Sequence, residues 1–371
     1  MMKRLFTMVL PLLLTACGDA SLGGNGNNPQ VGSLPLSIIE PADNPSTNEK
    51  IALGRMLFWD PILSGNEDVA CATCHHPNVG YGDNLDVSMG VGGLGLATER
   101  VSGALVLRNA PTIINTAYNG IDEDGNYDPS ATVMFWDNRS VSLEAQALDP
   151  IRSLEEMRGE MFTEEEILPE VVFRLSQNSE YISMFTDAFG DSTINEERIG
   201  KAIAAFERSL IANNSPFDRY ARGDNSALSQ QQIQGLNAFI DAGCNACHSG
   251  PMFSDFQLHE LPVDSNHKLV SEGISDNGVN NTFRTPSLRN VELTAPYMHN
   301  GTVKTLREAI VFYDDMANPG GDPDISQLDF EDVDAETIDA IEAFLRSLTD
   351  QDFDKSIPES VPSGLNPGGN I

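Results

Sequence analysis

Apolar residues recur at helical spacing in two short stretches that lie far apart in the chain. Residues 202–210 read Ala-Ile-Ala-Ala-Phe-Glu-Arg-Ser-Leu and residues 340–348 read Ala-Ile-Glu-Ala-Phe-Leu-Arg-Ser-Leu, so seven of nine positions are identical. In both stretches the alanine, isoleucine, phenylalanine and leucine fall on one face of a helix. Strand-like alternation is rare elsewhere. The pattern predicts a mainly α protein of two halves, each ending with the same amphipathic helix.

The chain begins with a short basic region followed by an apolar run. Lys3 and Arg4 precede the mostly apolar residues 5–14, and small residues then lead to Cys17. Such a run is too short to span a bilayer as a stable helix and is typical of an export signal. Residues 14–17, Leu-Thr-Ala-Cys, resemble the lipobox of bacterial lipoproteins, although an ordinary secretory signal with an incidental cysteine gives the same pattern.

We therefore expect residues 1–16 to be a lipoprotein signal peptide that directs the protein to the periplasm. The lipid on Cys17 would anchor the protein to a bacterial membrane. Residues 18–32 are rich in glycine and asparagine, which predicts a flexible tether over residues 17–34.

The other four cysteines form two pairs, each followed directly by a histidine. The residues are Cys71, Cys74 and His75 in the first motif and Cys244, Cys247 and His248 in the second. A redox disulfide or a zinc site also uses cysteines at this spacing. The trailing histidine favours c-type haem, whose attachment sequence is Cys-x-x-Cys-His, with thioethers from the cysteines and the histidine on the iron. The two motifs predict two covalently attached haems.

The motifs and the closing helices divide the chain into halves, separated by a helix-breaking Asn-Asn-Ser-Pro at residues 213–216. We expect two cytochrome c-like helical domains, residues 35–212 and 213–349, each with one covalently attached haem. From Ser356 onward the chain is rich in proline and glycine, which predicts a disordered tail over residues 350–371. From motif to closing helix the first half takes 131 residues and the second 96, which predicts extra structure over the first haem.

The chain carries 22 Lys and Arg residues against 55 Asp and Glu residues, a net charge of −33. This charge argues against nucleic acid or an anionic membrane surface as a partner. It favours recruitment of a basic protein, such as a small electron carrier, by long-range attraction. A solvated acidic coat suited to a salty habitat explains the charge equally well.

Beyond the two motifs, the sequence resembles the bacterial di-haem cytochrome c peroxidases and their MauG-type relatives from about residue 53 to residue 348. The most specific segments are residues 107–112, 135–139, 143–157, 285–291 and 294–301. The resemblance implies a reactive haem in the first half and an electron-transferring haem in the second. It also implies hydrogen peroxide as substrate and a small cytochrome c or copper protein as electron donor.

The resemblance assigns roles to single residues. Trp136 matches the tryptophan between the two haems, and Gln146 and Glu156 match the polar pair over the reactive iron. Peroxide splits heterolytically when a base moves a proton from one oxygen to the other, and a carboxylate such as Glu156 does this. By itself Glu156 is one acid on a solvated helical face, and a buried tryptophan is more often core, so both roles rest on the matching segments.

Asn109, Thr294 and Pro296 match the residues that hold a structural calcium ion between the two domains. The asparagine side chain and the two backbone carbonyls would give hard oxygen ligands of the kind that calcium takes. The resemblance therefore implies a calcium ion besides the two haems.

One departure from the peroxidase pattern lies near the first haem. Many of the peroxidases carry a histidine in a Ser-x-Gly-His-Gly loop, which caps the reactive iron until the second haem is reduced. Residues 88–92 here read Ser-Met-Gly-Val-Gly. Because Val91 cannot bind iron, we predict a first haem that is five-coordinate or water-bound as isolated and needs no reductive activation.

A second departure concerns the distal ligand of the second haem. The position of the peroxidases' methionine is Tyr313, and MauG-type enzymes have a tyrosine ligand there. A phenolate would lower the potential of the second haem and let it share oxidising equivalents with the first. Met298 and Met316 lie close to Tyr313 in the sequence, so a methionine ligand is the alternative.

Three functions fit these features. The favoured one is a haem peroxidase that reduces hydrogen peroxide to water with electrons from a small redox protein. A MauG-type enzyme, which uses peroxide to oxidise side chains of a partner protein, is favoured by Tyr313 and Val91. Those enzymes carry a surface tryptophan before the second motif, where this chain has Ala242. A di-haem electron-transfer protein without catalysis is the third function, and the enlarged first half disfavours it.

Overall fold

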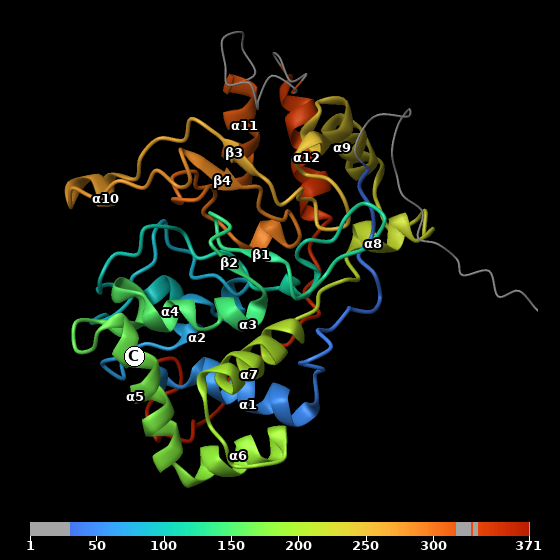
Figure 1. Cartoon of the computed structure of the whole chain (residues 1–371). Coiled ribbons are helices and arrows are strands. Elements are labelled where there is room, and N and C mark those ends of the chain that lie inside the picture. Colours follow the sequence, from blue (N-terminus) through green and yellow to red (C-terminus); the bar gives the residue numbers. More distant parts are fainter. Residues whose placement is uncertain (1–29, 317–327, 329–332, 371) are drawn as a thin grey trace, which may run out of the picture.

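The computed structural model describes residues 30–316, 328 and 333–370, and most of its regular structure is helical (Figure 1). The α-helices are α1 (Asn48–Trp59), α2 (Cys71–Cys74), α3 (Leu143–Gln146), α4 (Asp149–Arg152), α5 (Glu164–Gln177), α6 (Ser179–Phe189), α7 (Glu196–Arg208), α8 (Pro216–Ala221), α9 (Gln230–Asp241), α10 (His267–Ser271), α11 (Leu306–Met316) and α12 (Ala335–Arg346). One π-helical turn, η5 (Leu154–Arg158), and the short 3-10 helices η1 (Pro61–Leu63), η2 (Pro77–Val79), η3 (Ala97–Glu99), η4 (Thr116–Tyr118), η6 (Cys244–Ala246) and η7 (Val291–Leu293) lie between them. The strands form two antiparallel pairs, β1 (Val133–Met134) with β2 (Ser140–Val141) and β3 (Leu258–Glu260) with β4 (Thr282–Arg284). The predicted mainly α fold is confirmed.

The same close helix crossing occurs once in each half. α1 packs against α7, and a Cβ added to Gly54 would overlap the carbonyl oxygen of Ala202. α9 packs against α12, and a Cβ added to Gly235 would overlap the carbonyl oxygen of Ala340. Figure 1 shows the first crossing in the lower half of the molecule and the second in the upper half. The helix repeat in the sequence is therefore also a repeat of helix packing.

An aromatic pair stands beside each crossing. The ring centroids of Phe58 and Phe206 are 5.1 Å apart, and those of Phe239 and Phe344 are 5.4 Å apart. All four rings are buried, so each pair holds its two helices together through apolar contact. Phe206 and Phe344 occupy the same position of the repeated stretch.

Polar caps determine where these helices begin. The Ser229 hydroxyl accepts a hydrogen bond from the N–H of Gln232, whose side-chain oxygen accepts one from the Ser229 N–H at the start of α9. Asn195 and Asp334 cap α7 and α12 through a side-chain oxygen. Each cap contributes about 1 kcal/mol, because it satisfies a backbone donor that the helix leaves unpaired.

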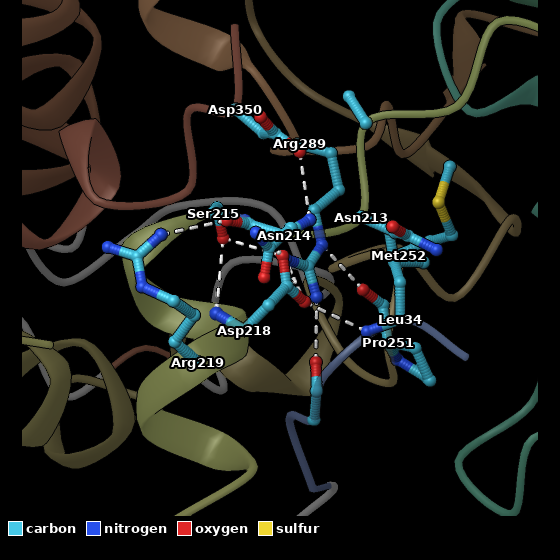
Figure 2. Close-up of polar contacts among 12 residues, drawn as sticks. Leu34, Asn213, Asn214, Ser215, Asp218, Arg219, Pro251, Met252, Arg289 and Asp350 are labelled. Carbon is cyan, nitrogen blue, oxygen red and sulfur yellow. Dashed lines mark hydrogen bonds and ion pairs between the residues drawn. The ribbon is translucent and has the colours of Figure 1, made fainter. Parts of the chain in front are cut away.

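The first described residues pack against the second half. The Leu34 N–H donates to a carboxylate oxygen of Asp218 at 2.9 Å (Figure 2). The Arg289 guanidinium donates to the same carboxylate at 2.9 Å and to the Gly32 carbonyl at 2.8 Å. The Asp218 and Arg289 side chains are 0% and 2% exposed. Residues 30–34 thus differ from the predicted flexible tether, because their polar backbone groups have buried partners.

The C-terminal tail packs against the first half. Residues 353–370 form no helix or strand, but the Thr73 hydroxyl donates to the carbonyl of Gly368 at 2.7 Å. The Ser363 hydroxyl donates to the buried Asp60 carboxylate at 2.6 Å. The prediction of a disordered tail is wrong for these residues, since polar groups of the first half bind this extended segment.

None of the helices in the described ranges is long and apolar enough to cross a membrane. The predicted signal peptide, residues 1–16, and the predicted lipid-anchor residue Cys17 lie outside the described residues. Residues 209–215 link α7 to α8, and this link contains the predicted domain boundary.

Candidate functional site

Both cysteine motifs hold their histidine in the same way. Nδ1 of His75 donates to the carbonyl oxygen of Tyr81 at 3.0 Å, and Nδ1 of His248 donates to the carbonyl oxygen of Phe253 at 3.0 Å. A carbonyl oxygen only accepts, so Nδ1 carries the proton and Nε2 keeps a lone pair. Burial lowers the pKa of both histidines, which favours the neutral ring that binds a metal.

No disulfide joins the four cysteines of the two motifs in the described residues. Burial raises the pKa of Cys71 and of Cys244 to about 12. Disulfide exchange starts from a thiolate, which this burial disfavours. The sulfur atoms fit thioether bonds to a porphyrin better than they fit a redox disulfide.

A mostly apolar cavity opens beside the second motif. Its lining includes both cysteines of the motif together with His248, Tyr313 and Met298. A flat apolar macrocycle held by two cysteines and a histidine needs such a space. The second motif and its cavity therefore fit a c-type haem.

Tyr313 on α11 lines this cavity. Burial raises the pKa of its hydroxyl, and the nearby thiols of Cys244 and Cys247 add to the rise. Both effects disfavour a free phenolate, so the ionised form needs a cation such as ferric iron beside it. Met298 lines the same cavity, whereas the side chain of Met316 lies outside the described residues. The structure brings Tyr313 and Met298 to the same space, and tyrosine ligation stays a prediction.

Glu156 lies in the π-helical turn η5, which ends at Gly159 with a φ of 66°. Such turns interrupt the regular hydrogen-bond pattern of an α-helix and often occur at functional sites. Burial raises the pKa of Glu156, while Arg139 and a hydrogen bond to Ser153 oppose the rise. A carboxyl with a raised pKa takes up and returns a proton more readily near neutral pH.

The charge of Glu156 acts on the first motif. Burial raises the pKa of Cys71 and Cys74, and the carboxylate of Glu156 adds to the rise at both thiols. The carboxylate therefore lies near the first motif. Gln146, the half-buried last residue of α3, is not joined to Glu156 by any hydrogen bond in the described part of the chain.

The loop over residues 88–92 packs directly on the turn that holds Glu156. The Val91 N–H donates to the carbonyl oxygen of Glu155 at 3.1 Å. A Cβ added to Gly90 would overlap that same oxygen, so the loop approaches this closely only with glycine there. Val91 and Glu155 also line an open surface cleft. Position 91, where the family pattern has the capping histidine, is therefore next to Glu156 and beside a cleft open to solvent.

Trp136 lies where the two halves meet, in the loop between β1 and β2. Its indole N–H donates to the carbonyl oxygen of Asn109 at 3.0 Å. Its own carbonyl oxygen accepts from the N–H of Arg284 at 2.7 Å. The residue also lines the cavity of the second motif, so it is held by both halves at the edge of the space for the second haem.

The three residues predicted to bind calcium, Asn109, Thr294 and Pro296, line the same cavity. The side-chain nitrogen of Asn109 donates to the carbonyl of Leu85 at 2.7 Å, which fixes the orientation of the amide. The Asn109 N–H donates to the carbonyl of His299 at 2.9 Å and joins the two halves. Side-chain and backbone oxygens in one place fit a hard cation, and the calcium ion stays a prediction.

Two polar residues of the cavity beside the second motif were not among the predicted site residues. Arg284 lines the cavity, its Nε has no hydrogen-bond partner in the described residues, and burial lowers its pKa to about 10. Nε2 of His259 lies 2.8 Å from an Asp255 carboxylate oxygen, and this contact raises the pKa of His259 to about 10. Two cationic groups beside an apolar cavity fit the propionate groups of a haem. Neither residue stands in a distinctive sequence motif, so only the fold reveals them.

Comparison with known proteins identifies the family. A family model described as di-haem cytochrome c peroxidase matches residues 48–226. The methylamine utilization protein MauG of Methylophilus methylotrophus is 35% identical over 321 residues, which cover 85% of this chain and 86% of that protein. The cytochrome c551 peroxidase of Nitrosomonas europaea is 31% identical over 369 residues, which cover 98% of this chain and 97% of that protein.

Solved structures of similar fold include a MauG-like protein and a diheme peroxidase. A crystal structure of a MauG-like protein associated with microbial copper homeostasis has a TM-score of 0.67 at 28% identity and covers 85% of this chain and 95% of that chain. The diheme peroxidase BthA from Burkholderia thailandensis, at 22% identity and a TM-score of 0.64, covers 92% of this chain and 95% of its own and shows the same fold. The resemblance seen in the sequence is confirmed: the chain belongs to the di-haem cytochrome c peroxidase family, a family of haem oxidoreductases with two c-type haems.

Proposed function

We propose that the protein reduces hydrogen peroxide at its first haem motif, with Glu156 as the acid and base of the reaction. The observation that carries this proposal is the position of Glu156 in a π-turn near Cys71 and Cys74, with its pKa raised by burial. From there the carboxylate takes a proton from one peroxide oxygen and returns it to the other, which leaves as water.

A haem held by Cys71, Cys74 and His75 would supply the iron that binds peroxide and takes up its two oxidising equivalents. The protein orients His75 through the carbonyl of Tyr81. Val91 offers no atom that binds iron, so the loop that packs on Glu155 does not compete with peroxide. Gln146, which the family pattern pairs with Glu156, would help to orient the peroxide.

The electrons would come from a small redox protein through the second haem and Trp136. Trp136 supports this path because its side chain bonds to Asn109 in the first half and its backbone to Arg284 in the second. The net charge of −33 favours a basic electron donor.

A MauG-type oxidation of a partner protein is the second candidate. Tyr313 in the second cavity favours it, because a phenolate ligand makes the second haem a poor store of electrons. Position 242 disfavours it: Ala242 is 5% exposed at the end of α9, so the position presents no aromatic side chain to a partner protein.

One experiment separates these functions. Stoichiometric peroxide is added to the fully oxidised protein, and a reduced cytochrome c is added next. Rapid oxidation of the cytochrome supports the peroxidase. A long-lived oxidised state that ignores the cytochrome favours oxidation of a partner protein instead. No spectral response to peroxide contradicts both and leaves a di-haem electron carrier.

We also propose that the protein is exported to the periplasm and anchored by a lipid on Cys17, which rests on residues 1–17 alone. Labelling of cells with radioactive palmitate tests this. Label on the wild-type protein but not on a Cys17→Ser variant supports the anchor, and an unlabelled wild-type protein contradicts it.

A further inference from the structure

A buried glutamate of the first half has no part in the function proposed above. Glu207, near the end of α7, is 5% exposed. Its Oε2 has no hydrogen-bond partner among the described residues. An unpaired buried carboxyl is costly, so its presence in a native site requires an explanation.

The helix repeat shows which way Glu207 faces. In the repeated stretch Glu207 takes the position of Leu345, and Leu345 lines the cavity beside the second haem motif. The two crossings share the same glycine–alanine contact and the same phenylalanine pair. Equivalent positions of equivalent crossings point the same way, so Glu207 points toward the first motif.

A second observation agrees with this orientation. Burial raises the pKa of Cys71 to about 12, and Glu207 contributes more to that rise than any other charged group. Cys71 is the first attachment residue of the first haem motif. The unpaired carboxyl therefore lies beside the place where this haem would be attached.

Few charges compensate Glu207. Burial raises its pKa to about 8, while Arg208 opposes the rise and Glu144 adds to it. Arg208 already pairs with Glu144 at 2.8 Å, so its positive charge is shared. Once the sulfur of Cys71 is bonded to the haem as a thioether, it carries no proton and can no longer ionise. The second half has a leucine at this position, so the second haem lacks such a neighbour.

We propose that Glu207 binds and releases a proton as the first haem changes its oxidation state. The inference rests on attachment of a haem at Cys71 and Cys74, not on the reaction that this haem catalyses. Loss of one electron to an external acceptor raises the local charge by one, and Glu207 then releases one proton to solvent. Reduction reverses both transfers, so the charge of the buried site stays constant.

The test is the reduction potential of each haem in the holoprotein as a function of pH. We expect the reduction equilibrium of the first haem to change by up to tenfold per pH unit, about 59 mV for one electron. The potential falls as pH rises, because the ionised carboxylate stabilises the oxidised haem. In Glu207→Gln the reduction potential of the first haem should no longer depend on pH, and at alkaline pH it should be higher than in wild type. The reduction potential of the second haem should be unchanged.

Glu197→Gln is the matched control, since Glu197 lies on the same helix with an exposed side chain paired with Lys201. It should leave both potentials as in wild type. Glu207→Leu installs the residue of the second half and should also flatten the dependence. A first-haem potential that is independent of pH in wild type, or that keeps its slope in haem-loaded Glu207→Gln, overturns the proposal. Potentials are measured without peroxide, so this outcome is distinct from a failure of the peroxidase proposal.

Discussion

The backbone N–H of Val91 donates to the carbonyl oxygen of Glu155 at 3.1 Å, and this bond joins the loop of the missing capping histidine to the turn that carries Glu156. Position 91 is therefore held against the turn that carries the carboxyl that we propose to act on peroxide. We therefore predict that the residue at position 91 decides whether the first haem site is open as isolated or must be activated.

Val91→His should close this site. The imidazole would bind the iron of the oxidised protein and give a low-spin, six-coordinate first haem by EPR. Peroxide reduction should then be slow until the second haem is reduced. Val91→Leu, which also cannot bind iron, is the control and should keep the wild-type spectrum. A low-spin signal from both haems in oxidised wild type would contradict the premise of an open site.

Glu156→Gln should lower kcat/KM for peroxide by about 10²–10⁴, the usual contribution of a positioned acid–base group. The reaction needs the carboxylate form, so the wild-type rate should fall as pH drops through the pKa of Glu156. Because burial raises that pKa, the fall begins at a higher pH than for an exposed glutamate. Stopped-flow rates from acid to neutral pH measure both effects.

Glu155→Gln is the control for this prediction, because the Glu155 side chain is exposed in the same turn. Its rate and pH profile should match wild type. Equal losses in the two variants would show that the charge of the turn matters and not the carboxyl of Glu156.

Tyr313→Met should raise the reduction potential of the second haem, because a thioether stabilises reduced iron where a phenolate stabilises oxidised iron. The thioether-to-iron charge-transfer band should appear in the oxidised variant and be absent from wild type. If wild type already shows this band, a methionine is the ligand and tyrosine is excluded. Tyr313→Phe is the control: it removes the hydroxyl that would bind iron but keeps the ring, so it separates the loss of a ligand from a loss of packing.

Removal of calcium should destabilise the protein and slow electron transfer between the halves. An ion present at 100 times its Kd contributes about 2.7 kcal/mol to the free energy of unfolding. A chelator should lower the melting temperature, and added Ca²⁺ but not Mg²⁺ should restore it. Elemental analysis that finds no bound calcium, with an unchanged melting temperature in chelator, would refute the predicted site at Asn109, Thr294 and Pro296.

Arg289→Met should cost about 3–5 kcal/mol of unfolding free energy, because it removes the cation closest to the buried carboxylate of Asp218. Denaturant unfolding measures the change. Arg307→Met is the matched control: Arg307 pairs with Asp339, and their side chains are 43% and 55% exposed. Its cost should be about 0–1 kcal/mol. Similar losses of unfolding free energy in both variants would mean that the buried ion pair stabilises the protein no more than the exposed one.

The helical fold and the two motifs were predictable because they depend on local patterns. The stretch that ends at Leu210 and its copy that ends at Leu348 show helical periodicity, and each histidine follows its cysteines directly. Attachment chemistry and periodicity both act over a few residues, so a single sequence displays them.

Contacts between distant residues were not predictable in this way. Arg284 reaches the second cavity only because β4 pairs with β3 and its backbone bonds to Trp136. Composition alone predicts a disordered tail, yet the tail contacts Asp60 and Thr73, which lie 303 and 295 positions earlier in the chain. Composition describes what a segment can do alone and carries no information about a partner elsewhere in the chain.

The first and last described segments of the chain are exchanged between the halves. Residues 30–34 bind the second half through Asp218 and Arg289, while residues 353–370 bind the first half. A cut within residues 209–215 would therefore leave each piece without a segment that it needs, and the halves are not separable modules. During synthesis the first half is therefore completed only after the second half, because residues 353–370 leave the ribosome later than residues 213–349.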